Sequence, residues 1–105
     1  MEIKRGDVVW AKLFKDKTRR SVVVRSSRFH KSDNYTVCPI SSSDKHFNLV
    51  RTYVDPGMSG LDVRSVVETD RLQTVPGARI GKLVGRLTAA EMQAIDEGLR
   101  LWLDL

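Results

Sequence analysis

Short apolar runs separated by polar turns recur along the first 87 residues and predict a domain built mainly of β-strands. Three successive valines at 22–24 favour a strand that is buried on both faces. Pro39 cannot donate to a β-ladder, so we expect it at a sheet edge or a strand end. The predicted strands span residues 7–14, 21–26, 35–40, 47–54, 61–70 and 79–87.

Residues 88–105 form the only segment with a helical pattern. Thr88 and Glu91 have the spacing of a capping box, and apolar residues then repeat on one face at 92, 95, 99 and 102. The predicted fold is α+β: a small, mostly antiparallel, barrel-like β-sheet with a C-terminal helix, in a single domain of residues 1–105. Trp102, Leu103 and Leu105 are compatible with a dimer surface and equally with completion of the monomer core.

The net charge of +5 is unevenly distributed along the chain. Residues 1–53 carry a net charge of +7, whereas residues 54–105 carry −2. A polyanion is therefore a natural partner, and nucleic acid is favoured over a membrane because no lipidation signal, basic amphipathic helix or long apolar run is present. Cys38 is the only cysteine, which excludes an internal disulfide and makes a reducing cytoplasm the expected location.

A candidate anion site lies between the second and third predicted strands. Arg20 precedes one strand and the hydroxyls of Ser41 and Ser42 follow the next, so antiparallel pairing would bring them to the same edge. A guanidinium can clamp a phosphate and stabilise charge that builds up during phosphoryl transfer. The alternative is a serine-capped turn beside a surface arginine. Three neighbouring cations, Lys15, Lys17 and Arg19, are expected to contact phosphates of a nucleic acid.

Two carboxylates are candidates for an acid or base. Glu68 and Asp70 are two residues apart on a predicted strand and hence on one face; the alternative is a solvated outer face. His30, Cys38 and His46 do not have the spacing of a zinc site, so no metal or other cofactor is expected.

Several segments together resemble one family. Residues 4–10 (KRGDVVW), 20–24 (RSVVV) and 37–42 (VCPISS) are similar, in this order, to segments of the MazF/PemK (Kid) toxins of bacterial toxin–antitoxin modules, and the similarity continues through 60–61, 65–67 and 80–99. The resemblance implies a dimeric, metal-independent endoribonuclease that cuts single-stranded RNA at short sequences in the bacterial cytoplasm and is silenced by a cognate antitoxin.

The same resemblance implies roles for single residues. Arg20 matches the family's catalytic arginine, although Ser21 replaces the proline that normally follows it, and Ser41 stands where the family has threonine. Asp7 matches an acidic position after Arg-Gly, and Asp70 matches an aspartate of the Kid branch. Glu68 replaces that branch's second arginine, and the loop at residues 15–19 is shorter than is common and lacks a histidine.

This resemblance predicts a cleavage mechanism, and two alternatives remain: a non-enzymatic gyrase poison, and a basic RNA-binding module that binds RNA without cleaving it. The 2′-hydroxyl of the RNA would attack the adjacent phosphate, giving a 2′,3′-cyclic phosphate and a 5′-hydroxyl, with Arg20 stabilising the phosphorane and Ser41 bonding a non-bridging oxygen. The first alternative is a non-enzymatic poison of DNA gyrase like the CcdB toxins, which share the fold and use C-terminal residues near a tryptophan; Trp102 has that position here.

Overall fold

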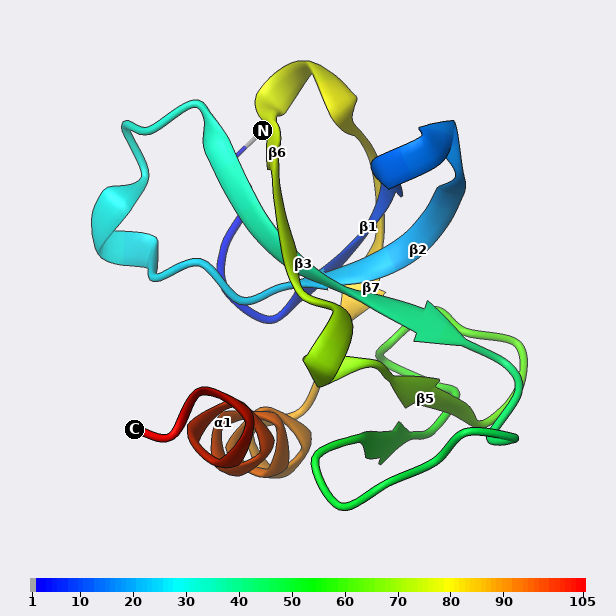
Figure 1. Cartoon of the computed structure of the whole chain (residues 1–105). Coiled ribbons are helices and arrows are strands. Elements are labelled where there is room, and N and C mark those ends of the chain that lie inside the picture. The colour runs from blue at the N-terminus through cyan, green and yellow to red at the C-terminus, as the bar shows by residue number, and fades with distance from the viewer. Residues whose placement is uncertain (1) are drawn as a thin grey trace.

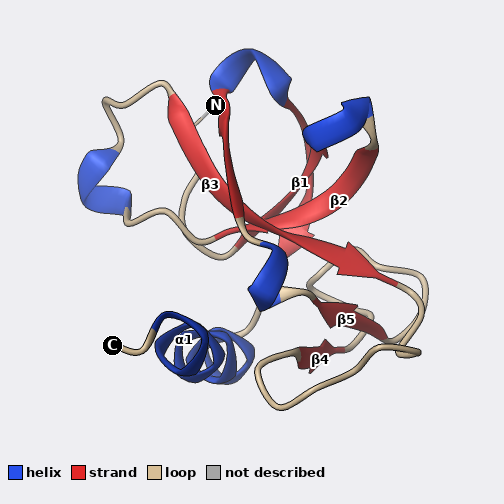
Figure 2. Cartoon of the chain, viewed as in Figure 1, coloured by secondary structure: helices blue, strands red, loops and turns tan. Residues whose placement is uncertain are grey.

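The computed structural model describes residues 2–105, within which seven antiparallel strands precede one C-terminal α-helix (Figure 1). Four short 3-10 helices lie between the strands (Figure 2): η1 (Phe14–Asp16), η2 (Ser27–Phe29), η3 (Thr69–Arg71) and η4 (Gly77–Arg79). The strands are β1 (Asp7–Lys12), β2 (Thr18–Val23), β3 (Asn34–Ser41), β4 (Thr52–Val54), β5 (Ser65–Val67), β6 (Gln73–Pro76) and β7 (Ile80–Arg86). The predicted α+β fold is confirmed, with a barrel-like sheet that is not strictly closed.

Strand β3 is the centre of the sheet. The hydrogen-bonded order is β4-β5-β3-β2-β1-β7, and β6 also pairs with β3. One side of β3 pairs with β2, while its other side pairs first with β6, at Asn34–Val37, and then with β5, at Ile40–Ser41. In Figure 1 this long strand runs across the molecule, with β6 beside its first half and β5 near its end. The residues that follow β3 therefore emerge at the rim shared by two parts of the sheet.

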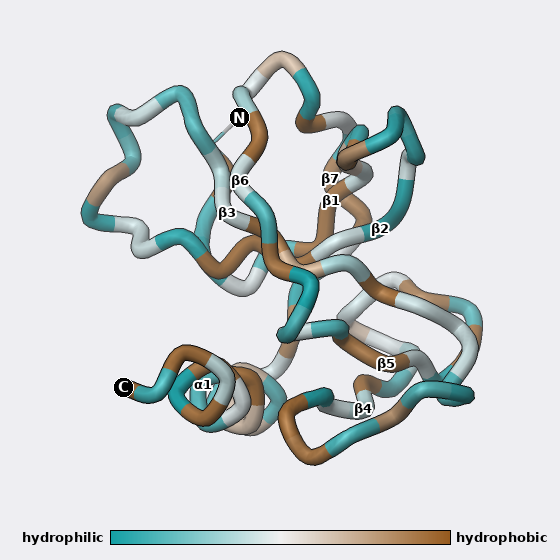
Figure 3. Tube along the Cα trace, in the orientation of Figure 1, coloured by the Kyte–Doolittle hydropathy of each residue, from teal (hydrophilic) through white to brown (hydrophobic). Residues whose placement is uncertain are grey.

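Both faces of the central strands are buried, as the valine run predicts. Val8, Val22 and Cys38 pack in one apolar cluster together with Ile95 of the helix, while the adjacent Val9, Val23 and Val37 pack in a second cluster on the opposite face. Successive side chains of a strand point to opposite faces, which explains why these strands are continuous apolar runs and not alternating ones. Figure 3 shows brown segments along these strands and teal at the hairpin between β1 and β2.

Helix α1 (Ala89–Leu103) covers the first cluster and packs against β4 and η3 (Thr69–Arg71). Its start is the predicted capping box: the Thr88 hydroxyl accepts from the backbone N–H of Glu91, and the Glu91 carboxylate accepts from the backbone N–H of Thr88. Ile95 and Gly98 are buried against the rest of the protein. The helix therefore holds η3, and with it the chain that leads from β5 to β6.

Several predicted boundaries are wrong. Strand β2 begins at Thr18 and not at residue 21, because Thr18, Arg19 and Arg20 already pair with β1 across a tight hairpin. The predicted strand 47–54 forms only β4, and the predicted strand 61–70 forms only β5, after which the chain turns into η3. Strand β6 was not predicted, since its four residues between two turns are too few to show a periodicity.

The prediction that Pro39 lies at an edge or a strand end is also wrong. Pro39 is paired with Ser21 inside the central strand and is buried. Its carbonyl accepts from the backbone N–H of Glu68. A residue's N–H and C=O point to the same side of a strand, so the missing N–H of Pro39 falls where the ladder with β6 ends and the ladder with β5 begins. The sheet therefore accommodates the proline without losing a ladder hydrogen bond.

The apolar residues at the end of α1 do not complete the monomer core. Trp102, Leu103 and Leu105 are 52%, 46% and 85% exposed. Of the two interpretations offered by the sequence, the core interpretation is excluded. No helix within residues 2–105 combines the length and the hydrophobicity needed to cross a membrane.

Candidate active site

An open hollow of about 480 Å³ lies at the rim of the sheet, where β2 begins and β3 ends. Its size falls within the roughly 300–1,000 Å³ range typical of small-molecule sites. Residues from β1, β2, β3 and the segment around η3 form its walls. The lining residues are Trp10, Lys17, Thr18, Arg19, Arg20, Ile40, Ser41, Ser42, Glu68 and Arg71. We refer to this hollow as the rim pocket.

The antiparallel pairing of β2 with β3 brings Arg20 and Ser41 into the same pocket. Ser21 faces Pro39 in the register of the two strands, so Arg20 lies one residue before this pair and Ser41 two residues after it. Because the strands run in opposite directions, these positions meet at one end of the ladder. The convergence expected from the sequence is present: both side chains line the rim pocket.

The guanidinium of Arg20 is free to bind an anion. Within residues 2–105 Arg20 forms no ion pair. Its Cζ atom lies 5.7 Å from the centroid of the Trp10 ring, and the two residues face each other in the β1–β2 register. This cation–π contact orients the arginine without using its N–H donors.

The Ser41 hydroxyl has a proton available for a ligand. Its oxygen accepts a hydrogen bond of 3.1 Å from the backbone N–H of Ser43, so the hydroxyl proton is not used in that contact. The serine-capped turn, which the sequence offered as the alternative to an anion site, is therefore present. The Ser41 hydroxyl can still donate a hydrogen bond within this turn. Ser42 is exposed and lines the same pocket.

The pocket is strongly cationic. Lys17, Arg19, Arg20 and Arg71 line it, against one carboxylate, that of Glu68. Lys15 does not line the rim pocket; it lies in an adjoining hollow that shares Lys17, Arg19 and Arg71 with it. Of the cations expected to contact RNA, Lys17 and Arg19 therefore line the pocket itself, and Lys15 lines the adjoining hollow.

The two candidate carboxylates at 68 and 70 are ion-paired and do not share the exposed face of a strand. Glu68 is 6% exposed and pairs with Arg19 and Arg51 at 3.1 and 3.4 Å. Asp70 lies in η3 outside the rim pocket and accepts two hydrogen bonds, of 2.8 and 3.1 Å, from Arg51. These bonds lower the pKa of Asp70, because they stabilise the charged carboxylate. A solvated outer face is excluded as well, since Glu68 is buried.

The third candidate carboxylate, Asp7, lies away from the pocket. It is 2% exposed at the start of β1, where it accepts from the backbone N–H of Lys4 at 2.8 Å and from Arg86 Nε at 3.2 Å. Asp7 faces Arg86 in the β1–β7 register. Its contacts tie the first strand to the last one.

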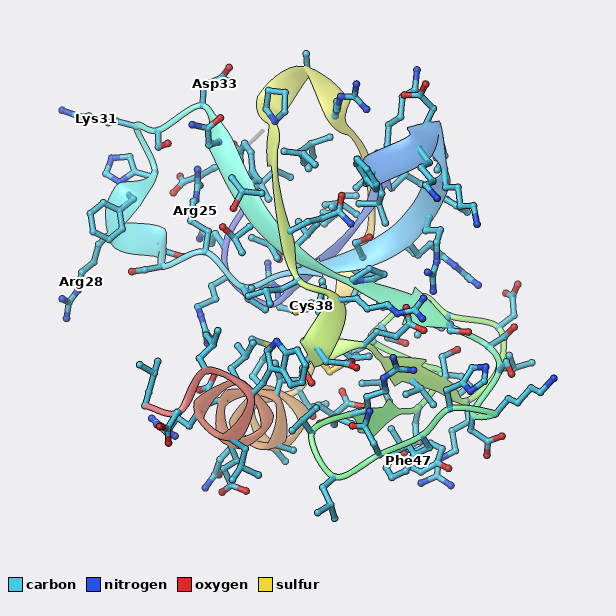
Figure 4. All side chains as sticks on the ribbon, in the orientation of Figure 1. Arg25, Arg28, Lys31, Asp33, Cys38 and Phe47 are labelled. Atoms are coloured by element: carbon cyan, nitrogen blue, oxygen red, sulfur yellow. The ribbon has the colours of Figure 1, made fainter. Side chains whose placement is uncertain are left out.

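The three residues considered for a metal do not form a site. Cys38 lies at the centre of the molecule (Figure 4), and burial raises the pKa of its thiol to about 12, so the thiol stays protonated. Both histidines are exposed. Among residues 2–105 there is no group of three His, Cys, Asp or Glu side chains arranged to hold a metal ion.

Sequence reasoning missed five residues in or behind the pocket: Trp10, Thr18, Ile40, Arg51 and Arg71. Trp10 could have been found, because an exposed tryptophan in the strand before the arginine pair is a suitable platform for a guanidinium. Arg51 and Arg71 carried no signal in the sequence, since they reach the site only through the loop before β4 and the short helix η3.

Fold and site together define a small antiparallel β protein with an open, cationic pocket suited to a phosphate. Comparison with known proteins narrows this assignment to one family. Residues 4–103 match the family described as PemK-like, MazF-like toxin of type II toxin-antitoxin system. The chain therefore belongs to this toxin family.

Individual relatives agree with this assignment. The chain is 29% identical to a probable endoribonuclease MazF of Mycolicibacterium smegmatis, with 98% of each chain covered. The structure is similar to the Mycobacterium tuberculosis toxin MazF-mt6, with a TM-score of 0.82, 31% identity, and coverage of 94% of this chain and 97% of that one. It shares its fold with an endoribonuclease from a mycobacterial species in complex with its cognate antitoxin, at 18% identity and a TM-score of 0.83, over 97% of this chain and 95% of that one. These matches do not favour the gyrase-poison alternative.

Proposed function

We propose that the protein is a sequence-specific, metal-independent endoribonuclease toxin that cleaves single-stranded RNA, with Arg20 and Ser41 at the centre of its active site. The observation that supports this proposal best is the meeting of Arg20 and Ser41 in one cationic pocket, in a chain that belongs to the MazF-like family. A guanidinium and a hydroxyl, drawn from two paired strands, supply donors for two different oxygens of one phosphate.

The proposed reaction uses the 2′-hydroxyl of the RNA as the nucleophile. This oxygen gives up its proton to solvent as it attacks the adjacent phosphorus, and the bond from phosphorus to the 5′-oxygen breaks as that oxygen takes up a proton from solvent, which leaves a 2′,3′-cyclic phosphate and a 5′-hydroxyl. Arg20 neutralises the charge of the phosphorane, and the Ser41 proton bonds a non-bridging oxygen. We assign no acid or base role to Asp7, Glu68 or Asp70, because each is engaged by an arginine.

Single-stranded RNA suits the site because the attacking oxygen, phosphorus and leaving oxygen must be aligned, and a flexible backbone permits this. Lys17 and Ser42 contact the flanking phosphates in this proposal, Arg19 contacts a phosphate from its place beside Arg20, and Lys15 extends the path into the adjoining hollow.

Binding through such contacts is expected to depend on salt. Replacement of Lys17 by alanine should weaken the binding of a single-stranded oligonucleotide and reduce the slope of log K against log salt by about 0.7, the value for one lost phosphate contact. Fluorescence titration at several salt concentrations measures this slope. Lys82→Ala is the control, since Lys82 is also exposed but lies outside the pocket. Equal slopes for wild type and Lys17→Ala would remove Lys17 from the RNA path.

The expected partners and location follow from family membership. We expect a homodimer in the bacterial cytoplasm, inhibited by a cognate antitoxin. An acidic antitoxin segment that becomes ordered on binding would be attracted by the positive charge concentrated in residues 1–53.

The function is tested by incubating the purified protein with a defined single-stranded RNA in EDTA and mapping the fragment ends. We expect cuts at a short recurring sequence, with cyclic phosphate on one fragment and 5′-hydroxyl on the other. A 2′-deoxy substitution at the cleaved position should block the reaction, because it removes the nucleophile. Intact RNA, or fragments that carry a 5′-phosphate, would contradict the proposal.

A further inference from the structure

The rim pocket contains a negative charge that an anion-binding site does not need. Of the described residues that line it, Glu68 alone carries a carboxylate, and this residue is 6% exposed. An unpaired carboxylate at this place would repel a phosphate and would be costly to bury. The contacts of Glu68 show why its presence is compatible with the site.

Glu68 lies within a row of alternating charges. In front of it, towards the pocket, Arg19 Nη1 lies 3.1 Å from Oε1; behind it, Arg51 Nη1 lies 3.4 Å from Oε2. Arg51 in turn donates to Asp70 through two bonds, Nε to Oδ1 at 2.8 Å and Nη2 to Oδ2 at 3.1 Å. We call Glu68, Arg51 and Asp70 the support chain of Arg19. At the end of this chain farthest from Arg19, the two hydrogen bonds from Arg51 to Asp70 fix the plane of the Arg51 guanidinium.

The support chain is attached to rigid parts of the fold. The side chain of Arg51 is 5% exposed, and the carbonyl of the preceding Val50 accepts from the hydroxyl of the buried Thr69. Glu68 is joined to the central strand through its backbone N–H, which donates to Pro39. Ion pairs buried in this way add little net stability compared with apolar side chains of similar volume, although removal of one partner leaves a costly buried charge.

The support chain does determine the position of Arg19. Besides its bond to Glu68, Arg19 donates from Nη2 to the carbonyl of Ile40 at 2.9 Å. These two bonds hold both ends of the guanidinium and use two of its five N–H donors, so three remain for a ligand. The neighbouring Arg20 has no ion pair within residues 2–105 and touches only a ring face through its guanidinium. One arginine of the pair is thus held in place and the other is free.

We propose that Glu68, Arg51 and Asp70 are positioning residues that hold Arg19 as a fixed second guanidinium for the scissile phosphate, beside the free guanidinium of Arg20. This inference rests on the proposed function and assigns Arg19 to the reacting phosphate, where the sequence predicted only a contact with phosphates. Arg19 contacts the phosphate, whereas Arg51 acts only through Glu68. Because the guanidinium of Arg19 is already held in place when the substrate binds, the reaction does not include the entropic cost of ordering it.

The first test is the kinetics of Glu68→Gln, which keeps the shape of the side chain and removes its charge. If Glu68 positions Arg19, kcat should fall, by up to about 100-fold, because a misplacement of about 1 Å at the reacting centre has an effect of that size. KM should stay constant or decrease, since the pocket becomes more positive. An unchanged kcat with a lower KM would mean that Glu68 is only an unfavourable charge, and would overturn the proposal.

The second test asks whether Glu68 acts through Arg19. In the Arg19→Ala background the substitution Glu68→Gln should cause little further loss of kcat, since the group that it positions is absent. Equal losses of kcat in both backgrounds would overturn the proposal. Asp96→Asn is the matched control: it removes the carboxylate of another partly buried pair, 2.6 Å from Arg5 Nη2 and outside the rim pocket, so its kinetics should match those of wild type.

A spectroscopic test needs neither the folding of a variant nor RNA cleavage. In wild-type protein the guanidinium protons of Arg19 should give resolved NMR signals that exchange slowly by rotation, whereas those of Arg20 should be averaged. Rapid rotation of Arg19 would overturn the proposal even if all variants failed to fold. Failure of wild type to cut RNA would instead overturn the proposed function, and the NMR result would still show whether the support chain holds Arg19.

Discussion

Replacement of Arg20 by alanine is expected to lower the rate of RNA cleavage by about 10²–10³-fold while the fold is retained. The reason is that Arg20 is the one guanidinium of the arginine pair without an ion pair among residues 2–105, so its donors are available for the transition state. Its removal costs the protein only an exposed cation–π contact, worth about 0.5–1 kcal/mol. Single-turnover cleavage of a defined RNA and thermal unfolding are the measurements.

Two further variants make the Arg20 experiment specific. Arg20→Lys keeps the charge but not the planar fork, and should recover only part of the rate if two phosphate oxygens are bound together. Arg64→Ala is the matched control, because Arg64 also stacks on a ring, with Cζ 4.1 Å from the centroid of Tyr53, and lies outside the rim pocket. An Arg20→Ala protein that still cleaves RNA and arrests growth at the wild-type rate would disprove the assignment.

Replacement of Gly98 by alanine should destabilise the protein by about 1–3 kcal/mol, the usual cost of overpacking a tight contact. In an exposed helix the same change would stabilise by about 1 kcal/mol. Here a methyl group at Gly98 would clash with the carbonyl oxygen of Val50, which is backbone and cannot move aside as a flexible side chain can. The clash therefore outweighs the gain in helix propensity, because the contact would be closer than those that real Cβ atoms make.

Thermal unfolding provides the measurement for Gly98→Ala, with a fall in Tm of about 4–8 °C for each kcal/mol lost. The control is Glu97→Ala, one position earlier on the same helix, where the residue is exposed and the helix propensities of Glu and Ala are close. Equal or higher stability of Gly98→Ala would show that helix α1 can shift away from Val50 at little cost. In that case the close packing of helix α1 against Val50 would not be what fixes the loop that carries Arg51.

The parts of the fold that could be predicted from the sequence are those with strong local signals. The valine run predicted a strand buried on both faces, and Thr88 with Glu91 predicted the start of the helix. The apolar pattern at residues 61–70 was misread as one strand, because the turn into η3 is imposed by tertiary contacts, such as the bond from the Thr69 hydroxyl to Val50. Local sequence does not contain that contact.

The candidate site could be predicted only in part, for a similar reason. Arg20 and Ser41 lie at the same end of the ladder between β2 and β3, so strand pairing alone brings them together. The partners of Glu68 come from β2 and from the loop before β4, at separations of 49 and 17 residues, and no periodicity relates these positions. The residues that support the site were therefore visible only in three dimensions.

Pro39 sets a limit on how this site can vary. Any other amino acid at this position would bring in a backbone N–H directed at the gap between the ladders with β6 and β5. A new donor there would have no ladder partner and would need water or a shifted neighbour to accept its hydrogen bond. Proline thus removes an unpaired donor from the strand two residues before Ser41, and so from the wall of the rim pocket.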